Sequence, residues 1–120
     1  AGHVYVDAND NGQLDAGEPG IAGVRVTLTG TAANGSAVSL VAITDANGRY
    51  VFDGLLPSDA SGYTLTETQP LAYADGRDTA GRLGGVAVGN AGNDTITGIV
   101  YTGGNGDGYL FGERAASIAG

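Results

Sequence analysis

The stretch that decides the fold runs from Val4 to Gly20 and reads VYVDANDNGQLDAGEPG. Its first residues alternate in the two-residue period of a β-strand. The twelve residues Asp7–Glu18 then match the pattern D-x-[DN]-x-[DN]-G-x5-E at every fixed position. Pro19-Gly20 follows at once and opposes a helix. The stretch therefore predicts a loop that joins two strands.

This loop has the chemistry of a calcium site. Calcium takes six to eight oxygen ligands, and Gly12 allows the sharp reversal that brings them together. We expect Leu14 to point inward and anchor the loop. The alternative interpretation is a solvated Asn/Asp/Gly turn that needs no metal. The predicted ligands are the side chains of Asp7, Asn9, Asn11, Asp15 and Glu18 and the backbone carbonyl of Gln13.

The rest of the chain repeats the two-residue period in short runs that are bounded by turn residues. About seven such runs predict an all-β sandwich. The segment Asp45–Gly48 is typical of a turn between two strands, with Gly48 as a turn-forming residue. Asp45 and Asn47 could instead offer oxygens to calcium, although the turn is favoured.

The segment Ala74–Asp94 is long, mostly polar and rich in glycine, and we expect a loop there. A loop of this length in a compact domain is usually functional or is ordered by a ligand. The side chains of Asp75, Asp78 and Asp94 could form a second metal site. The alternative is that Asp75 and Asp78 are solvated or paired with Arg77 or Arg82.

Composition excludes several classes of protein. The chain has 120 residues and a net charge of -8, with no cysteine and no lysine. Disulfides, zinc–thiolate sites and lysine–asparagine isopeptide bonds therefore cannot form. The acidic excess disfavours nucleic acid, and no apolar run approaches the roughly 20 residues of a membrane helix. We expect one monomeric domain over residues 1–114, a linker over residues 115–120, and a longer parent protein.

Catalysis finds little support. The single histidine, His3, has no plausible nucleophile beside it. Glu18, Glu67 and Glu113 could in principle act as glycosidase carboxylates, but Glu18 is better used by calcium and the other two fall at strand ends. The run Gly89–Ile96 resembles one nonapeptide of the calcium-binding β-helix repeats, but the array that those repeats need is absent. We expect a protein that is not an enzyme.

Several motifs together resemble the B-type repeat of Sdr-type bacterial adhesins, a calcium-dependent relative of the collagen-adhesin B domain. The motifs follow one another from Gly2 to Glu113 and cover nearly the whole chain. They are Gly2–Asp7 leading into the calcium loop, Glu18–Val24, Val26–Leu28, Thr44–Phe52, Leu55, the positions Tyr63, Leu65, Thr66, Glu67 and Pro70, and Tyr109–Glu113.

The resemblance implies a prealbumin-like or Ig-like sandwich with Greek-key character, more than one bound calcium, and tandem repetition in a protein secreted to the bacterial surface. It implies a stalk or spacer whose partners are neighbouring repeats, with a host or glycan ligand bound by other domains. Two other hypotheses are an adhesion domain that itself binds a glycan or host protein, and an accessory domain of a secreted enzyme.

Overall fold

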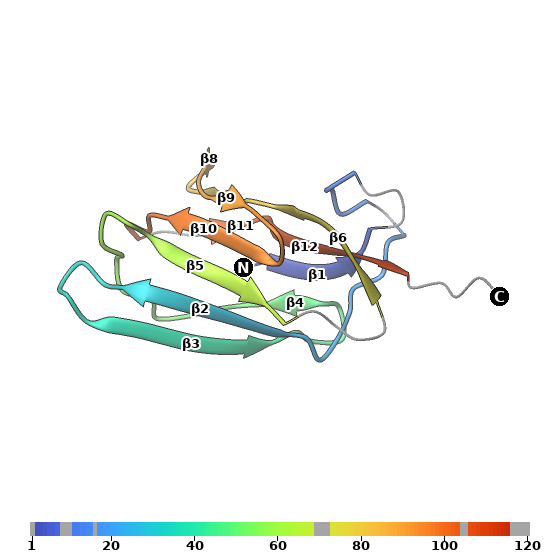
Figure 1. Ribbon diagram of the computed structural model, residues 1–120, viewed down its shortest axis with the longest axis horizontal. Coiled ribbons are helices and arrows are strands. Elements are labelled where there is room, and N and C mark those ends of the chain that lie inside the picture. Colours follow the sequence, from blue (N-terminus) through green and yellow to red (C-terminus); the bar gives the residue numbers. More distant parts are fainter. Residues whose placement is uncertain (1, 8–10, 16, 69–72, 104–105, 116–120) are drawn as a thin grey trace.

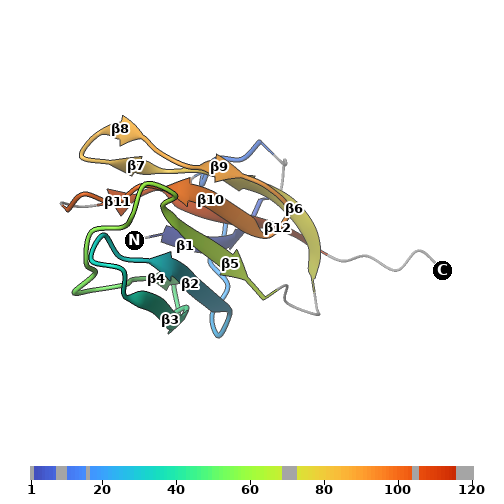
Figure 2. The same cartoon turned by 60° about the vertical axis from the view of Figure 1, so that its left-hand side comes forward.

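The computed structural model describes residues 2–7, 11–15, 17–68, 73–103 and 106–115, and every regular element in these residues is a β-strand. Seven strands have five or more residues, and five strands have two. Figures 1 and 2 show two main sheets that lie face to face. The expectation of an all-β sandwich is confirmed.

One main sheet, sheet A, has the strand order β4-β1-β12-β6. The first and last strands, β1 and β12, are parallel neighbours in its centre, with Gly2 opposite Tyr109 and Val6 opposite Glu113. The other two pairs in this sheet are antiparallel. Its members are β1 (Gly2–Val6), β4 (Arg49–Tyr50), β6 (Tyr73–Thr79) and β12 (Tyr109–Ala115).

The other main sheet, sheet B, is antiparallel with the order β3-β2-β5-β10-β9. Its members are β2 (Arg25–Thr31), β3 (Ala37–Ile43), β5 (Tyr63–Glu67), β9 (Asn90–Ala91) and β10 (Thr95–Ile99). A third, small sheet has the order β11-β7-β8 and consists of β7 (Arg82–Leu83), β8 (Val86–Ala87) and β11 (Gly106–Asp107).

The core fills the space between the two main sheets. Alternate residues of β2 and β5 are buried, as the two-residue period predicts. Burial of each large apolar side chain contributes about 1.5–3 kcal/mol. The Tyr50 hydroxyl donates a hydrogen bond to the Tyr109 carbonyl at 2.8 Å, and so ties β4 to β12 across the start of β1. The buried core side chains include Val4, Val26, Leu28, Tyr63, Leu65, Ile96 and Phe111.

The prediction of a continuous loop over Ala74–Asp94 is wrong. This segment contains most of β6, the β7–β8 pair and β9. Among the described residues, the strand β6 lies at the edge of sheet A and pairs on one side only, and its sequence YADGRDT shows no apolar period. Its long pairing with β12 makes it a strand in spite of its low β-propensity.

The turn before β4 forms around Gly48, whose φ is +76°. Asp45 Oδ1 accepts hydrogen bonds from the backbone N–H groups of Asn47 and Arg49, both at 2.9 Å. These bonds lower the pKa of the Asp45 carboxyl. Asp45 thus uses its carboxylate to hold the turn, which favours the turn over the calcium interpretation of this segment.

Candidate metal centre

The predicted calcium loop leaves the end of β1 at Asp7, whose side chain is fully buried. The backbone N–H groups of the loop converge on this carboxylate: Asn11 donates to Oδ1 at 3.2 Å and Gly12 donates to Oδ2 at 2.8 Å. The backbone N–H of Asp7 donates to the Glu113 carbonyl at 2.7 Å. Asp7 therefore folds the loop back on itself and fixes it to β12.

The other described loop oxygens also accept hydrogen bonds within the loop. Asn11 Nδ2 donates to Asp15 Oδ2 at 2.7 Å, and the backbone N–H of Asp15 donates to Glu18 Oε1 at 2.8 Å. The backbone N–H of Gln13 donates to Asn11 Oδ1. Among the described residues, the carboxylate oxygens of Asp7, Asp15 and Glu18 do not lie close enough together to form a group of three potential metal ligands. Asn9 lies outside these residues.

Strand β6 holds the loop from the side. The Thr79 hydroxyl donates to the Gly12 carbonyl at 2.7 Å. Gly12 has φ +73°, and a Cβ there would lie 2.8 Å from Arg77 Cδ and 2.9 Å from Thr79 Oγ1. The expectation that Leu14 points inward is wrong, since its side chain is 39% exposed. Contacts with β6 at Gly12, and not an inward Leu14, hold the loop against the sandwich.

Two glycines of the loop offer a matched pair of substitutions. Gly17 also has a positive φ, +86°, but a Cβ there would meet nothing within 4 Å. Both Gly12→Ala and Gly17→Ala should lose about 1–2 kcal/mol of unfolding free energy because alanine disfavours a positive φ. Gly12→Ala should lose about 1–3 kcal/mol more through overpacking against β6. Urea unfolding measures the difference, and equal losses would show that β6 does not confine the loop.

A second acidic group lies between the two main sheets. One carboxylate oxygen each of Glu67, Asp78 and Asp94 lies within 4.8 Å of the others. Glu67 is on β5, Asp78 is on β6, and Asp94 directly precedes β10. The backbone N–H of Glu67 donates to the Asp94 carbonyl at 2.9 Å, and the backbone N–H of Asp94 donates to Asp78 Oδ2 at 2.8 Å. We call these three residues the acidic cluster.

The Glu67 carboxyl has an environment that disfavours its charge. Its side chain is 3% exposed, and Glu113, which is fully buried, lies next to it. Burial raises the pKa of Glu67 well above its usual range, and the carboxyls of Glu113 and then Asp94 raise it further. Neither Glu67 oxygen accepts a hydrogen bond from the described residues, and neither does Asp94 Oδ1.

The residues of the acidic cluster fit a hard divalent cation. All of its ligand atoms are carboxylate oxygens, which calcium and magnesium prefer over nitrogen or sulfur ligands. Buried carboxylates without donors need either protons or a cation to offset their desolvation. An ion here would take the place of the proton that Glu67 shares with the neighbouring carboxyls of Glu113 and Asp94.

Comparison with known families agrees with the resemblance drawn from the sequence motifs. The family model described as the SdrD B-like domain matches residues 2–86 of this chain. The chain belongs to the SdrD B-like domain family.

Known proteins with similar sequences include serine-aspartate repeat-containing protein F of Staphylococcus epidermidis, which is 37% identical over 106 residues and matches 82% of this chain. Serine-aspartate repeat-containing protein E of Staphylococcus aureus (strain USA300) is 33% identical over 107 residues. Colossin-B of Dictyostelium discoideum is 46% identical over 70 residues, or 58% of this chain. The matches span 6%, 9% and 2% of these three proteins.

The structure of this SdrD B-like domain brings together part of the second site that the sequence suggested. Asp78 and Asp94 lie in the acidic cluster. The backbone of Asp75 lies in β6 opposite Glu113, and its side chain is outside what the structure describes. Sequence analysis missed Glu67 as a member of this site and Glu113 as its buried neighbour. The alternation of residues along the strands could have located them. Glu67 continues the inward face of Tyr63 and Leu65, and Glu113 continues that of Phe111.

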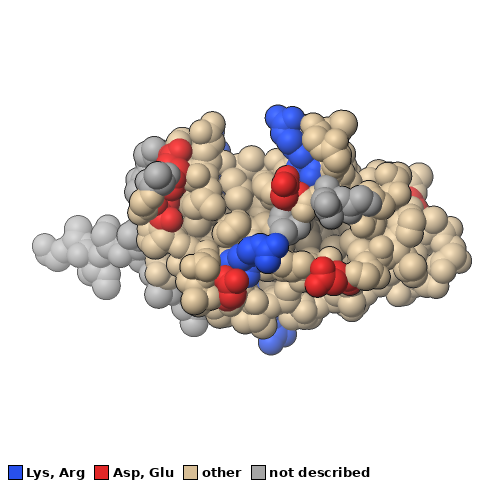
Figure 3. Space-filling view, turned by 180° about the vertical axis from the view of Figure 1, so that it is seen from behind, with Lys and Arg blue, Asp and Glu red and all other residues tan. Residues whose placement is uncertain are grey.

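The surface of the domain carries no broad basic area on the face shown in Figure 3, where acidic groups are small and separate and basic side chains are few. In the described part of the chain, no helix has the length and apolarity that a membrane crossing requires.

Proposed function

We propose that this domain is a non-catalytic spacer repeat of a secreted bacterial surface adhesin, and that bound calcium makes it rigid. The observation that carries the proposal is the buried Glu67 carboxyl, which faces Asp78 and Asp94 and meets only other carboxyls, Glu113 and Asp94, as side-chain hydrogen-bond partners in the described residues. A domain that only needed a packed core would gain more from an apolar side chain at this position.

Two calcium positions support rigidity in different ways. In the loop, the ligands are the side chains of Asp7, Asn9, Asn11, Asp15 and Glu18 with the Gln13 carbonyl, and the ion replaces the internal hydrogen bonds of the loop. In the acidic cluster, an ion joins β5 of sheet B to β6 of sheet A. The second ion therefore fastens one sheet to the other, as a disulfide would in a domain with cysteines.

The proposed arrangement in the parent protein is a tandem array. Residues 1–114 form one monomeric module, residues 115–120 link it to the next, and its partners are neighbouring repeats. Host proteins or glycans bind to other domains of the same adhesin. Membership of the SdrD B-like domain family and the small share of each relative that the chain spans support this arrangement.

Calorimetric titration of calcium into the chelator-treated domain tests the proposal. We expect at least two ions to bind. Glu18→Ala should abolish the loop ion, and Glu67→Gln should abolish the ion of the acidic cluster, each with the other site kept. Asp53→Asn, at an exposed acid outside both sites, should bind the full number. Absence of calcium binding to the unsubstituted domain would refute the proposal.

A second candidate function is that the domain itself binds a host protein or glycan. The edge strand β3 favours it, because Val41 and Ile43 are each 54% exposed and Leu40 is 38% exposed. Exposed apolar edges are regions where another chain can add. A binding screen with Val41→Ser as the matched variant separates this function from a pure spacer.

A further inference from the structure

Strand β3 is an edge of sheet B without the usual protection of an edge strand. The other edge strands of the two main sheets, in the described residues, are short or charged: β4 and β9 have two residues each, and β6 has the sequence YADGRDT. β3 has seven residues, AVSLVAI, and its register with β2 contains no bulge. Proteins normally protect a long edge strand with charges, proline or a bulge, because it can pair with another chain.

The hydrogen bonds at the two ends of the β2–β3 pair show which backbone groups of β3 are directed outward. The N–H of Ala32 donates to the Ser36 carbonyl, and the N–H of Thr44 donates to the Val24 carbonyl. Such bonds recur at every second residue of an antiparallel pair, so the even-numbered residues of β3 bond to β2. The odd-numbered residues direct their N–H and carbonyl groups away from β2. These residues are Ala37, Ser39, Val41 and Ile43.

The side chains make this edge apolar on both faces of the sheet. On the inner face, Val38 and Ala42 pack against the core, and Leu40 between them is still 38% exposed. On the outer face, Val41 and Ile43 are exposed. In Figure 1 β3 lies along the lower border of the molecule, with no described segment beyond it. A strand that paired with β3 would bury apolar surface on both faces.

We propose that the open edge of β3 pairs with the same edge of a second copy of this chain. The two strands run antiparallel about a two-fold axis at Leu40. Ser39 of one copy then lies opposite Val41 of the other, and Ala37 lies opposite Ile43. All four outward residues of each copy fall in hydrogen-bonded positions, and the two copies of sheet B form one continuous sheet.

The register favours a second copy as the partner. With the axis at Leu40, every outward residue of the seven-residue strand has a partner. If the axis moved to Ser39 or to Val41, one outward residue of each copy would face a residue outside β3. The Leu40 side chains of the two copies meet in a non-hydrogen-bonded pair, where opposite side chains are closest. Both of them are thereby removed from water at the rim of the core.

The distribution of charge allows two acidic copies to meet at this edge. A net charge of -8 opposes most contacts between copies. β3 has no charged residue, and Asp45 is the one charged residue in the sequence from Asn34 to Ala46. In the proposed register Asp45 lies opposite Gly35 of the other copy, and its carboxylate already accepts two hydrogen bonds in its own turn. No acidic side chain of these segments therefore faces another.

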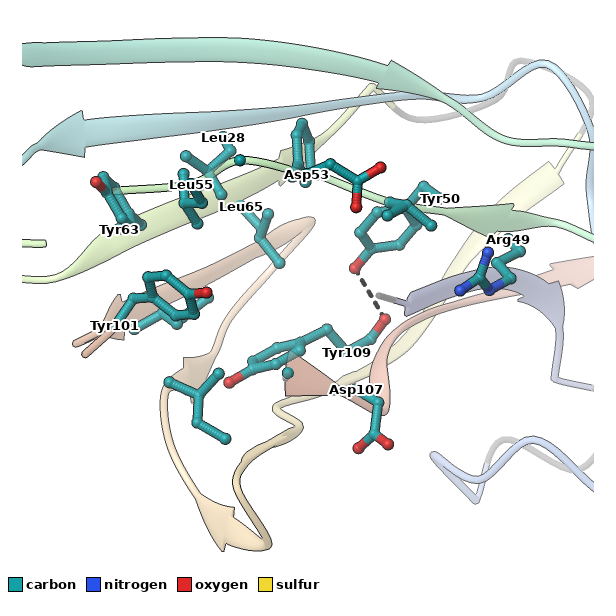
Figure 4. A pocket seen from close by; sticks show the side chains of 16 residues that line it. Leu28, Arg49, Tyr50, Asp53, Leu55, Tyr63, Leu65, Tyr101, Asp107 and Tyr109 are labelled. Atoms are coloured by element: carbon teal, nitrogen blue, oxygen red, sulfur yellow. Dashed lines mark hydrogen bonds between the residues drawn. The ribbon is translucent and has the colours of Figure 1, made fainter. Parts of the chain in front are cut away.

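The size of the contact predicts weak pairing. A strand pair of seven residues is about 23 Å long and covers less than the roughly 1,200 Å² of a stable interface. The domain is therefore monomeric in dilute solution and pairs where copies are crowded. None of the residues that line the pocket in Figure 4 comes from β3, so the pairing leaves that pocket unchanged. The pairing does not depend on the proposed spacer function, but in tandem arrays it would join neighbouring stalks side by side and gain avidity.

Single-cysteine variants test both the contact and its register, because the chain has no cysteine of its own. Leu40→Cys places the thiols of two copies opposite each other at the axis. Val41→Cys has Ser39 opposite it, and Val86→Cys lies on β8; both replace side chains that are more exposed than Leu40. With oxidised glutathione as the oxidant, Leu40→Cys should form disulfide-linked dimers at least about tenfold faster than either control. Equal rates, or faster linkage of the more exposed thiols, would overturn the proposal.

Amide hydrogen exchange of the unsubstituted chain in calcium tests the pairing without a cysteine. Raising the protein concentration from about 20 μM to about 1 mM should slow exchange at Ser39, Val41 and Ile43 at least about threefold. Leu40 and Ala42 should keep their rates, because their N–H groups already bond to β2.

A proline on the open edge is the matched control for this measurement. Ser39→Pro removes an outward N–H without breaking a bond to β2, so the variant should stay folded and lose the concentration dependence at Val41. Val41→Lys, which protects the edge with a charge, should do the same at Ser39 and Ile43. If exchange in the unsubstituted chain does not depend on concentration, the edge does not bind a second copy and is left for a strand of another protein. The calcium titration remains a separate test of the spacer function.

Discussion

Removal of calcium is expected to lower the midpoint of thermal unfolding by at least about 15 °C. An ion at about a thousand times its dissociation constant stabilises the folded state by about 4 kcal/mol, and each kcal/mol shifts the midpoint of a domain of this size by about 4 °C. Without the ions, the loop keeps only its internal hydrogen bonds and Glu67 has no positive partner in the acidic cluster. Melts followed by circular dichroism in millimolar calcium and in chelator measure the shift.

Two kinds of control test this result: a different metal ion, and substitutions at the two proposed calcium sites. Magnesium should restore little of the loss, because it demands octahedral geometry and gives up its waters reluctantly. Glu18→Ala and Glu67→Gln should each retain part of the calcium shift, and the double variant should retain none. A midpoint that is the same in calcium and in chelator would contradict both proposed sites.

In calcium-free buffer, the domain is expected to become less stable as the pH rises from 7 to 9. The folded state holds a proton on Glu67, whose pKa is raised by burial and by Glu113 and Asp94, whereas the unfolded chain has already released it. A carboxyl pKa that is raised by folding contributes stability that is fully present below the pKa of the unfolded chain. That stability is lost as the pH rises toward the pKa of the folded state. The loss amounts to as much as about 1.4 kcal/mol per pH unit.

Urea unfolding at pH 7, 8 and 9 measures this slope. Glu67→Gln should flatten it, since the amide is neutral at every pH, and Asp53→Asn should leave it unchanged. Saturating calcium should reduce it, because the ion takes the place of the proton. The window lies above the titration of His3, whose pKa is lowered by burial. A slope that persists in Glu67→Gln would show that the proton is held elsewhere.

The sandwich could be predicted because its signals are local. Val26 and Leu28, or Tyr63 and Leu65, alternate with polar residues, and turn residues separate the runs. Strand β6 could not be predicted in this way. Its residues Tyr73–Thr79 carry no period, and what makes them a strand is the pairing with β12, which is more than thirty residues away.

The candidate site was partly predictable for the same reason. The loop Asp7–Glu18 is a contiguous pattern with fixed spacing. The acidic cluster draws its residues from β5, from β6 and from the turn before β10, so only the folded arrangement shows that they meet. The alternation of residues along the strands puts Glu67 and Glu113 on the inward face, but the sequence analysis did not use it, and alternation alone does not show which buried acids face one another.

The parallel pairing of β1 and β12 has a mechanical consequence. The strand that enters the domain and the strand that leaves it lie side by side and point the same way, joined over five paired positions. A force that draws the two chain ends apart therefore slides one strand along the other and loads the hydrogen bonds between them together. It cannot peel them open one at a time. Asp7, whose N–H is bonded to the Glu113 carbonyl at the far end of this pair, adds one more hydrogen bond to those that share the load.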